Sequence, residues 1–553
     1  MNQTKITIKI LTAFLICICF SLQVQGQNLD RQFDQIISAS YQKDMPGATF
    51  LVAKNGKTIY RKAVGKSNLE LDVDMTVDNV FELASISKQF TAISILMLEE
   101  QGKLSTNDPI TKFIPDYPTN GKTITIHHLL NHTSGIKSYT DMGDLISFAR
   151  LDKSPKELID YFKNEPMDFD PGEEYAYNNS GYILLGYIIE VITGDTFENY
   201  VETNIFKTLG MYNSRYGSKT ELIKKRASGY GQNANGYVNS DYISMSIPYA
   251  AGSLMSTVDD MLKWQNALTN NTLIKASSLK KAINGSTLNN GEYIDYGYGL
   301  GALNFKGSKG YTHSGGIFGF STNGIYLIDK DTYVIGLSNC SCNDVSAVTR
   351  KLIAAAIGKP FPTMKDAITL PEAKMKQWVG AYEFEDGAIR HIFLKDGKLN
   401  SMRESETNTV FEIFPLSETR YMFEDGIEYN FSKTANGQRQ VVFITGTEMI
   451  GKETDKAMPK LKEGITLSNE VLTKTIGKYA LAPEFIIEVT VKDSQIFAQA
   501  TGQGQFELFA EDETNFFAKV APIKIRFNKD NSGTINSLTL FQGGREMPAE
   551  KIE

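Results

Sequence analysis

The sequence predicts an α+β fold in three parts: a mixed domain of helices and strands, followed by two small all-β, barrel-like domains. Two observations predict the mixed domain. Runs of β-prone residues lie near its beginning and again near its end, and apolar runs free of Gly and Pro lie between them. A third observation predicts the β domains, because short alternating strands and turns dominate beyond residue 360 and a sequence repeat begins there.

The segment 1–26 is typical of a signal peptide. Two lysines precede the apolar run from Ile10 to Phe20, and small residues before Gln27 offer a cleavage site. An uncleaved membrane anchor is the alternative, but the run is short for a span. No later stretch has the apolar length to cross a bilayer. We therefore expect an exported protein, periplasmic or extracellular, with no stable membrane span after cleavage.

The mixed domain is expected over residues 28–360. Thr49–Ala53 and Thr58–Ala63 flank an Asn-Gly turn and predict a hairpin. The stretch from Ser85 to Gln101 lacks Gly and Pro, is apolar around much of its surface and is followed by Gly102, which predicts a buried helix with a glycine after its C-cap.

Two more helices and three late strands complete this domain. The apolar run Ile183–Thr193 predicts one helix, and a second begins at Thr257 with acidic residues in its first turn. Strands are expected at Gly310–Thr312, Gly324–Ile328 and Tyr333–Leu337. Because sheet residues recur at both ends of the domain, we expect early and late strands to share one antiparallel sheet.

The repeat predicts two tandem β domains, over 366–460 and 468–553. The run Val379–Tyr382 recurs 97 residues later as Ile476–Tyr479, and Lys395-Asp396 recurs at the same offset. Both segments have alternating strands and turns, which is typical of small barrels or barrel-like sandwiches.

Composition excludes several functions. The chain has 553 residues, of which 41% are hydrophobic, and this length allows more than one domain with a core. Its net charge of −7 speaks against nucleic acid as a partner. No phosphate-binding glycine loop or dinucleotide fingerprint is present, so we expect no cofactor.

Cysteine and histidine positions predict no metal site. After residue 26 the chain has only Cys340 and Cys342, and a disulfide between residues i and i+2 would close a small, strained ring. We therefore expect two packing thiols. His128 and His132 have a spacing that can bind zinc on a helix, but no Glu stands between them as in H-E-x-x-H, so a structural role is expected.

Three short motifs predict nucleophilic chemistry. In Ser85-Ile86-Ser87-Lys88, positions i and i+3 share a helix face, so the Ser85 hydroxyl and the Lys88 amine can lie side by side. An adjacent base activates a serine hydroxyl. The motifs Tyr177-Asn178-Asn179 and His313-Ser314-Gly315 follow downstream. The ordered trio, rather than any single motif, indicates a serine hydrolase.

The residues around these motifs resemble the serine β-lactamase and penicillin-binding-protein family. The likeness covers roughly Gly47 to Ile357 and is nearest to the branch with class C β-lactamases, D-alanyl-D-alanine carboxypeptidases, D-aminopeptidases and esterases. It also includes the runs His128–Gly135 and Gly252–Thr257. The resemblance implies an antiparallel sheet with helices on both faces and a helical subdomain. The final repeat also resembles a β domain often appended to such hydrolases.

The resemblance assigns roles to the site residues. Ser85 is the expected nucleophile, and its own N–H can form half of an oxyanion hole at the start of a helix. The backbone N–H of Gly316, after Gly315, is the implied other half. Lys88 and Tyr177 form the acid–base system, with deacylation assigned to Tyr177, and which of them is the base in each step stays open. Asn179 is expected to point its amide towards substrate and Lys88.

His313 departs from most β-lactamases, which have Lys at this position. Histidine resembles the carboxypeptidase and aminopeptidase members and titrates near neutrality, whereas lysine is a near-permanent cation suited to a β-lactam carboxylate. We therefore expect a small-molecule or peptide substrate with an amide or ester bond, such as a D-amino-acid peptide.

Three alternatives stay open. The first is a class C type β-lactamase. The second is a penicillin-binding or sensor protein with slow deacylation. In the third, the β domains are the functional part, and contact with the cell wall through them is a related hypothesis.

Overall fold

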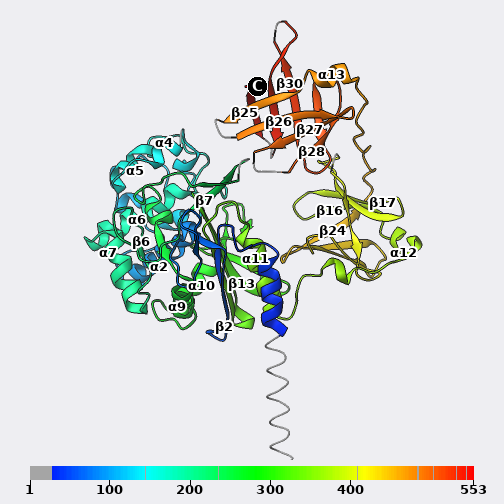
Figure 1. Cartoon of the computed structure of the whole chain (residues 1–553). Helices are drawn as coiled ribbons and strands as arrows, with labels where there is room; N and C mark the ends of the chain where they lie inside the picture. The colour runs from blue at the N-terminus through cyan, green and yellow to red at the C-terminus, as the bar shows by residue number, and fades with distance from the viewer. Residues whose placement is uncertain are drawn as a thin grey trace, which may run out of the picture. The chain divides into compact units, whose positions relative to one another are not determined.

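The computed structural model describes residues 28–552, apart from 144, 234–235, 408, 483–484, 502–503, 531 and 543–544. The predicted signal peptide therefore lies outside the described residues. The chain divides into two compact units, one ending at Pro360 and one from Phe361 onward, with the short segment Gln232–Val238 grouped with the second (Figure 1). Among the described residues, no helix is long and apolar enough to span a membrane.

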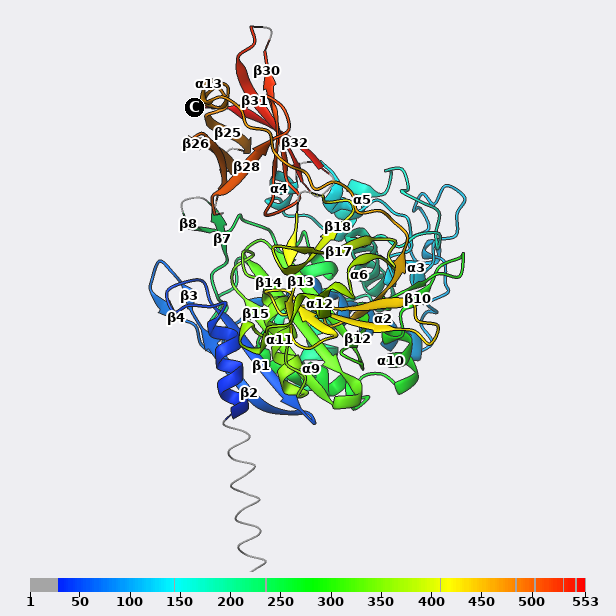
Figure 2. The ribbon, with the colours of Figure 1, turned by 90° about the vertical axis from the view of Figure 1, so that its right-hand side faces the viewer.

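A six-stranded antiparallel sheet with the order β12-β13-β14-β15-β1-β2 forms the centre of the first unit. Strands from both ends of the domain share it, as predicted, and Leu51 of β1 lies opposite Ile335 of β15. Figures 1 and 2 show the late green strands beside the early blue ones. The strands are β1 (Ala48–Lys54), β2 (Lys57–Val64), β12 (Gly301–Phe305), β13 (Ser308–Ile317), β14 (Phe320–Leu327) and β15 (Thr332–Ser338).

Helices cover both faces of this sheet, and its central strands β1, β14 and β15 are therefore buried on both sides. On one face, a side chain at Gly336 would meet Phe50 and the helix α11, so this glycine lets α11 lie close to the sheet. On the other face, Leu51 and Ile335 belong to one large apolar core with Trp264 of α9. The longer helices are α2 (Ser87–Glu100), α6 (Asn179–Thr193), α9 (Val258–Thr269) and α11 (Val345–Ala356), and another helix covers 28–38.

The predicted helices form with the expected ends. Gly102 has a φ of +71° just after α2, and Gly194 has a φ of +72° at the end of α6, where glycine avoids the strain of a Cβ. Asn178 caps α6 by accepting from the N–H of Gly181, and Thr257 caps α9. Shorter helices complete the helical subdomain and its surroundings: α3 (Ile126–Leu130), α4 (Leu145–Ala149), α5 (Pro155–Phe162), α7 (Phe197–Val201), α8 (Tyr249–Gly252) and α10 (Ala276–Ile283).

Short strands pair outside the main sheet. They are β3 (Lys66–Asn68), β4 (Val73–Asp74), β5 (Phe81–Glu82), β6 (Arg215–Tyr216), β7 (Tyr230–Asn233), β8 (Gly236–Asn239), β9 (Leu254–Ser256), β10 (Ser286–Thr287) and β11 (Tyr293–Ile294). The order β5-β9-β6 holds Phe81 opposite Ser256, just before the first site motif.

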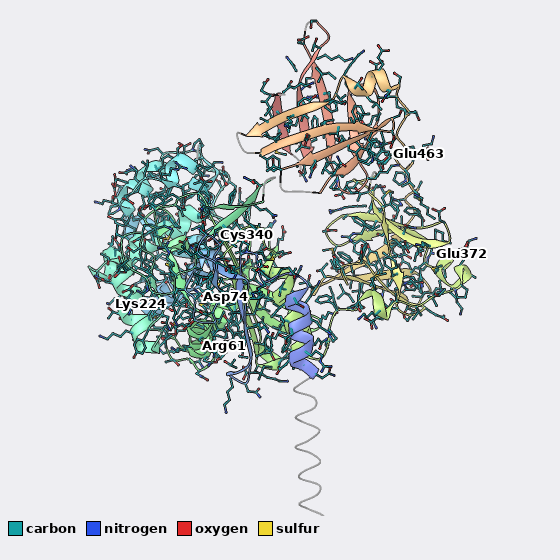
Figure 3. The ribbon with its side chains drawn as sticks, in the orientation of Figure 1. Arg61, Asp74, Lys224, Cys340, Glu372 and Glu463 are labelled. Carbon is teal, nitrogen blue, oxygen red and sulfur yellow. A yellow bond between two sulfur atoms is a disulfide. The ribbon has the colours of Figure 1, made fainter. Side chains whose placement is uncertain are left out.

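The expectation of two free thiols was wrong. Cys340 and Cys342 form a disulfide in the turn after β15, near the Cys340 label in Figure 3. The turn brings their Cα atoms to 5.1 Å, which lies within the range that a disulfide bridges. Sequence separation alone did not show that the backbone folds back here.

The first β domain is a nine-stranded sheet with the order β19-β18-β17-β16-β24-β23-β22-β21-β20. Its edge strands β19 and β20 are separated in the chain only by Ile413, so the sheet curls into a nearly closed barrel. A helix, α12 (Glu372–Lys376), precedes it. The strands are β16 (Gly380–Phe384), β17 (Ile389–Lys395), β18 (Lys398–Arg403), β19 (Phe411–Glu412), β20 (Phe414–Pro415), β21 (Arg420–Met422), β22 (Glu428–Lys433), β23 (Arg439–Ile444) and β24 (Glu448–Thr454).

The second β domain is a closed barrel of eight strands around an apolar core. The helix α13 (Asn469–Thr473) precedes it, as α12 precedes the first. Its strands are β25 (Gly477–Ala482), β26 (Phe485–Lys492), β27 (Gln495–Ala500), β28 (Phe506–Ala510), β29 (Asn515–Ala518), β30 (Lys524–Lys529), β31 (Ile535–Gln542) and β32 (Arg545–Lys551).

The sequence repeat corresponds to a structural repeat. The Tyr382 hydroxyl donates to the carbonyl of Trp378, and the Tyr479 hydroxyl donates to the carbonyl of Thr475 in the same place of the second domain. The predicted repeat of barrel-like domains is therefore present, with one barrel closed and the other nearly closed.

Candidate active site

Ser85 lies in a tight turn between β5 and α2. A short 3₁₀ helix, η1 (Ala84–Ile86), leads into α2. Ala84 has a φ of +51°, a conformation that costs energy for a residue with a Cβ and that is found often at functional sites. The carbonyl of Leu83 accepts from the Thr322 hydroxyl at 2.9 Å, which ties this turn to β14. The backbone is thus held in place on both sides of Ser85.

Lys88 lies one turn later, beside Ser85, as the spacing predicted. Its Nζ donates to Ser85 Oγ at 3.1 Å, to Asn179 Oδ1 at 2.8 Å and to the carbonyl of Ala251 at 2.9 Å. The side chain is 0% exposed, and the described residues place no carboxylate within ion-pair distance of it. Burial lowers the pKa of Lys88 to about 7, because the charged form loses its hydration.

Tyr177 and Asn179 approach this pair from the N-terminal end of α6. Lys88 Nζ lies 4.9 Å from the centroid of the Tyr177 ring. Burial raises the pKa of Tyr177 well above its ordinary value, and the nearby Ser85 hydroxyl lowers it by less. Tyr177 is therefore a neutral phenol at pH 7, although 39% of the residue is exposed. Asn179 points its amide oxygen at Lys88, as expected.

Strand β13 passes close to Ser85 because of a glycine. A Cβ on Gly315 would lie 2.4 Å from the carbonyl oxygen of Leu83 and 3.0 Å from the Ser85 nitrogen, so only glycine fits there. A Cβ on Gly316 would meet no atom within 4 Å. The strand therefore leaves open space at Gly316, beside the turn that holds Ser85.

A small cavity of about 130 Å³ opens onto these groups. Ser85, Asn179 and Gly316 line it, and none of its lining residues is charged. The remaining lining residues are apolar or neutral: Ala84, Tyr139, Thr140, Leu145, Ile243, Ile247, Pro248, Ala251, Gly252, Ile317 and Phe318. The cavity fits a small, uncharged portion of a ligand.

His313 differs from expectation in its charge. Its Nδ1 donates to the carbonyl of Ser314 at 2.6 Å, so the other ring nitrogen, Nε2, accepts from the Tyr296 hydroxyl at 2.8 Å. Burial, with a smaller contribution from Lys88, lowers the pKa of His313 to about 4. The expectation of a histidine that titrates near neutrality was therefore wrong, because sequence did not show that the side chain is buried.

His128 and His132 bind backbone groups in different places. His128 Nδ1 accepts from the N–H of Thr125 and completes the cap of α3. His132 Nδ1 accepts from the N–H of Asn178, which follows Tyr177 in the chain. The ring centroids of His132 and Tyr177 lie 4.3 Å apart. His132 therefore supports the Tyr177 segment.

Three groups at this site were not found by sequence reasoning. The carbonyl of Ala251 accepts from Lys88, Thr140 Oγ1 accepts from Asn179 Nδ2 at 3.2 Å, and Tyr296 holds His313. Ala251 adjoins the run Gly252–Thr257, which offered a signal. Thr140 and Tyr296 offered none, because their positions depend on distant contacts.

Comparisons with known proteins agree with this arrangement. The family model described as Beta-lactamase matches residues 29–358, and a domain of unknown function (DUF3471) matches residues 461–551. Penicillin-binding protein 4* of Bacillus subtilis (strain 168) is 31% identical over 453 residues, which cover 76% of this chain and 98% of that protein.

Two solved structures are similar as well. The octameric penicillin-binding protein homologue from Pyrococcus abyssi aligns with a TM-score of 0.54 at 26% identity, over 77% of this chain and 99% of that one. The D-stereospecific amidohydrolase from Streptomyces sp. aligns with a TM-score of 0.52 at 25% identity, over 59% of this chain and 98% of that one. With its fold and its Ser85–Lys88 pair, this chain belongs to the β-lactamase and penicillin-binding-protein-like family of serine hydrolases.

Proposed function

We propose that this serine hydrolase cleaves an amide or ester bond through an acyl-enzyme on Ser85, and that it acts outside the cytoplasm. The observation that carries the mechanism is the 3.1 Å contact between Ser85 Oγ and the fully buried Lys88 Nζ. Export rests on the segment 1–26 alone.

Acylation begins with a neutral amine. With a pKa of about 7, a substantial fraction of Lys88 is deprotonated at neutral pH and can accept the Ser85 proton. Ser85 Oγ then bonds to the substrate carbonyl carbon. The N–H groups of Ser85 and Gly316 stabilise the negative oxygen, and the C–N or C–O bond to the leaving group breaks as that group takes a proton.

Tyr177 serves as the proton relay. Because the Tyr177 phenol is protonated at pH 7, it donates its proton to the leaving group and recovers a proton through Lys88. It does not act as a base before the leaving group departs. In deacylation a water takes the place of the leaving group, and the same relay removes its proton.

The substrate class follows from the neutral cavity. A β-lactam carries a carboxylate, but the ring nitrogens of His313 are both occupied and no charged residue lines the cavity. These observations favour an amide or ester that places an uncharged, apolar side chain in the cavity and carries no carboxylate, over a β-lactam. The similarity to a D-stereospecific amidohydrolase supports D-amino-acid amides or peptides as the substrates to test first.

The test compares wild type with Ser85→Ala. Intact-mass analysis after incubation with a fluorescent penicillin measures the adduct, while nitrophenyl acetate and the D- and L-forms of phenylalanine amide measure turnover. We expect an adduct and D-selective turnover in wild type, and a loss of about 10⁴-fold or more in Ser85→Ala, because no other group replaces the nucleophile.

Ser38→Ala, on the exposed face of the helix over 28–38, is the matched control and should match wild type. An adduct that persists for hours with no turnover would favour the penicillin-binding or sensor alternative. Rapid turnover of penicillin would favour the β-lactamase alternative. No adduct and no turnover would contradict the proposal.

A further inference from the structure

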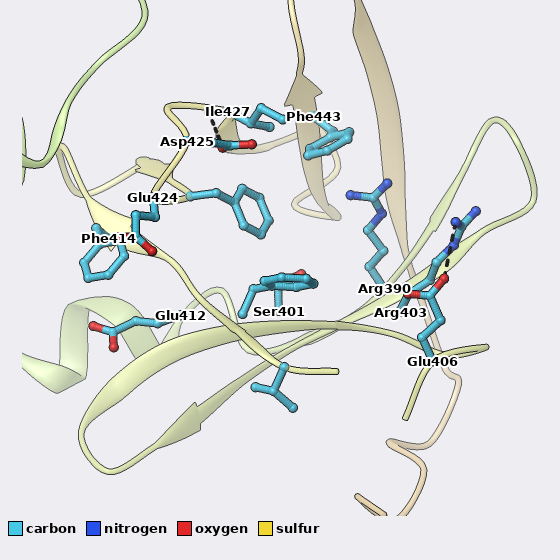
Figure 4. A pocket seen from close by; sticks show the side chains of 13 residues that line it. Arg390, Ser401, Arg403, Glu406, Glu412, Phe414, Glu424, Asp425, Ile427 and Phe443 are labelled. Atoms are coloured by element: carbon cyan, nitrogen blue, oxygen red, sulfur yellow. Dashed lines mark hydrogen bonds and ion pairs between the residues drawn. The ribbon is translucent and has the colours of Figure 1, made fainter. Parts of the chain in front are cut away.

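The first β domain contains a cavity of about 670 Å³, larger than the one beside Ser85 (Figure 4). Cavities of roughly 300–1,000 Å³ are typical of small-molecule sites. Aromatic and charged side chains share its walls. The lining residues are Arg390, Ser401, Arg403, Glu406, Val410, Phe411, Glu412, Phe414, Phe423, Glu424, Asp425, Ile427 and Phe443.

Arg390 is a cation in this cavity without a carboxylate partner among the described residues. Its guanidinium carbon lies 3.9 Å from the ring centroid of Phe443 and 4.9 Å from that of Phe384, and its Nη1 donates to the Tyr429 hydroxyl at 3.1 Å. Its Nε is buried and has no hydrogen-bond partner. A buried donor of this kind costs stability unless something binds it.

Arg403 shows the contrast within the same cavity. It lies 3.7 Å from Asp386 and 4.0 Å from Glu406, so its charge is already balanced. Figure 4 shows the Arg403–Glu406 pair at one side, apart from the guanidinium of Arg390 beside Phe443. Of the two arginines, only Arg390 has charge left for a ligand.

The other carboxylates of the cavity have local roles or lie apart from Arg390. Glu412 pairs with Lys398 at 2.8 Å, and Asp425 accepts from the N–H of Ile427 at 3.0 Å. Figure 4 shows Glu424 on the Phe414 side, across the cavity from the Arg390 guanidinium. None of them neutralises the cation.

The second barrel shows that this fold does not need the cavity. Arg390 faces Arg403 in β17–β18, and the matching pair 97 residues later is Ile487 and Ala500. In the same way, Tyr429 opposite Phe443 is matched by Ile525 opposite Leu540.

All four residues of the second barrel lie in its apolar core. One copy of the repeat therefore fills these positions with aliphatic side chains. The other has two arginines, a tyrosine and a phenylalanine there, and the arginines and the phenylalanine line the cavity.

We propose that this cavity is a ligand site for a small molecule with one carboxylate on an apolar body. The carboxylate binds the guanidinium of Arg390, whose planar array of N–H donors matches a carboxylate. The rings of Phe411, Phe423 and Phe443 contact the apolar body. The site lies in a different domain from Ser85 and has no part in the bond cleavage proposed above.

The test is calorimetric titration of the full chain with 3-phenylpropionate, and with 3-phenylpropylamine as the probe of opposite charge. We expect the carboxylate to bind at least tenfold more tightly than the amine. Arg390→Gln should weaken its binding by about 10- to 100-fold, because two charge-assisted hydrogen bonds are lost. Lys395→Gln removes an exposed cation at the end of β17, outside the cavity lining; it is the control and should change the Kd less than threefold.

Two results would overturn the proposal: tighter binding of the amine in wild type, or undiminished binding of the carboxylate in a folded Arg390→Gln. Circular dichroism checks that the variant folds. If it does not fold, Arg390→Lys replaces it, since the charge stays and only the fork is lost, and it should weaken binding about threefold or more. Unchanged binding in this variant, or no binding to wild type, would also overturn the site.

Discussion

Two cations in two parts of this molecule have no carboxylate partner among the described residues. Lys88 lies beside the small cavity that Ser85 and Asn179 line, and Arg390 lines the larger cavity. Lys88, in the first unit, is surrounded by neutral oxygens, and burial lowers its pKa to about 7. Arg390, in the first β domain, lies against aromatic rings and stays charged, since a guanidinium does not lose its proton in proteins.

This difference separates a site for chemistry from a site for binding. A buried lysine can give up its proton and become a base, whereas a buried arginine keeps its charge and can only attract an anion. The kind of cation therefore indicates what each cavity can do.

Lys88→Arg replaces an amine that can lose its proton with a guanidinium that keeps its charge. We expect the acylation rate constant to fall by about 10³-fold, because a permanent cation cannot accept the Ser85 proton. Stopped-flow acylation by nitrophenyl acetate measures this. Lys112→Arg, at an exposed ion pair with Asp108, is the control and should match wild type. Acylation at the wild-type rate in Lys88→Arg would remove Lys88 from the mechanism.

Ile487→Arg places the equivalent of Arg390 in the packed barrel. We expect the local free energy of unfolding of that barrel to fall by about 3 kcal/mol or more, because the charge is buried with neither a cavity nor a partner. Hydrogen exchange followed by mass spectrometry, on peptides from 468–553, measures the loss of protection. Ile487→Met keeps an apolar side chain of similar length and should stay protected. Equal protection in both variants would mean that the two barrels tolerate charge alike.

Tyr177→Phe keeps Lys88 as the base and removes the relay. We expect turnover to fall by about 10²-fold, with acyl-enzyme accumulating where deacylation is the slower step. Intact-mass analysis during turnover detects the accumulated adduct. Tyr175→Phe, on a neighbouring half-exposed ring, is the matched control. Turnover that is unchanged in Tyr177→Phe would assign the relay to another group.

The pH dependence distinguishes the two cations directly. Lys88 acts as a neutral amine, so kcat/KM should fall about tenfold per pH unit below its pKa of about 7 and level off above it. Binding of 3-phenylpropionate should stay constant between pH 6 and 9, since carboxylic acids titrate below this range and guanidinium groups above it. A kcat/KM that is flat through pH 7, or that rises as pH falls, would contradict the role given to Lys88.

The sequence by itself determined the features that depend on local spacing. The i, i+3 positions of Ser85 and Lys88 predicted their contact, and alternation and turn residues predicted the strands that begin and end the mixed domain. The offset of 97 residues predicted two related β domains. Short-range geometry fixes each of these, because helix and strand periods decide which neighbours share a face.

Only the tertiary structure decided the features that depend on distant neighbours. Burial lowered the pKa of His313 to about 4, where a histidine that titrates near neutrality was expected. Backbone folding at a turn joined Cys340 to Cys342. One repeat packed solid while the other stayed hollow around Arg390, because desolvation and packing are set by the atoms that the fold brings together and not by sequence separation.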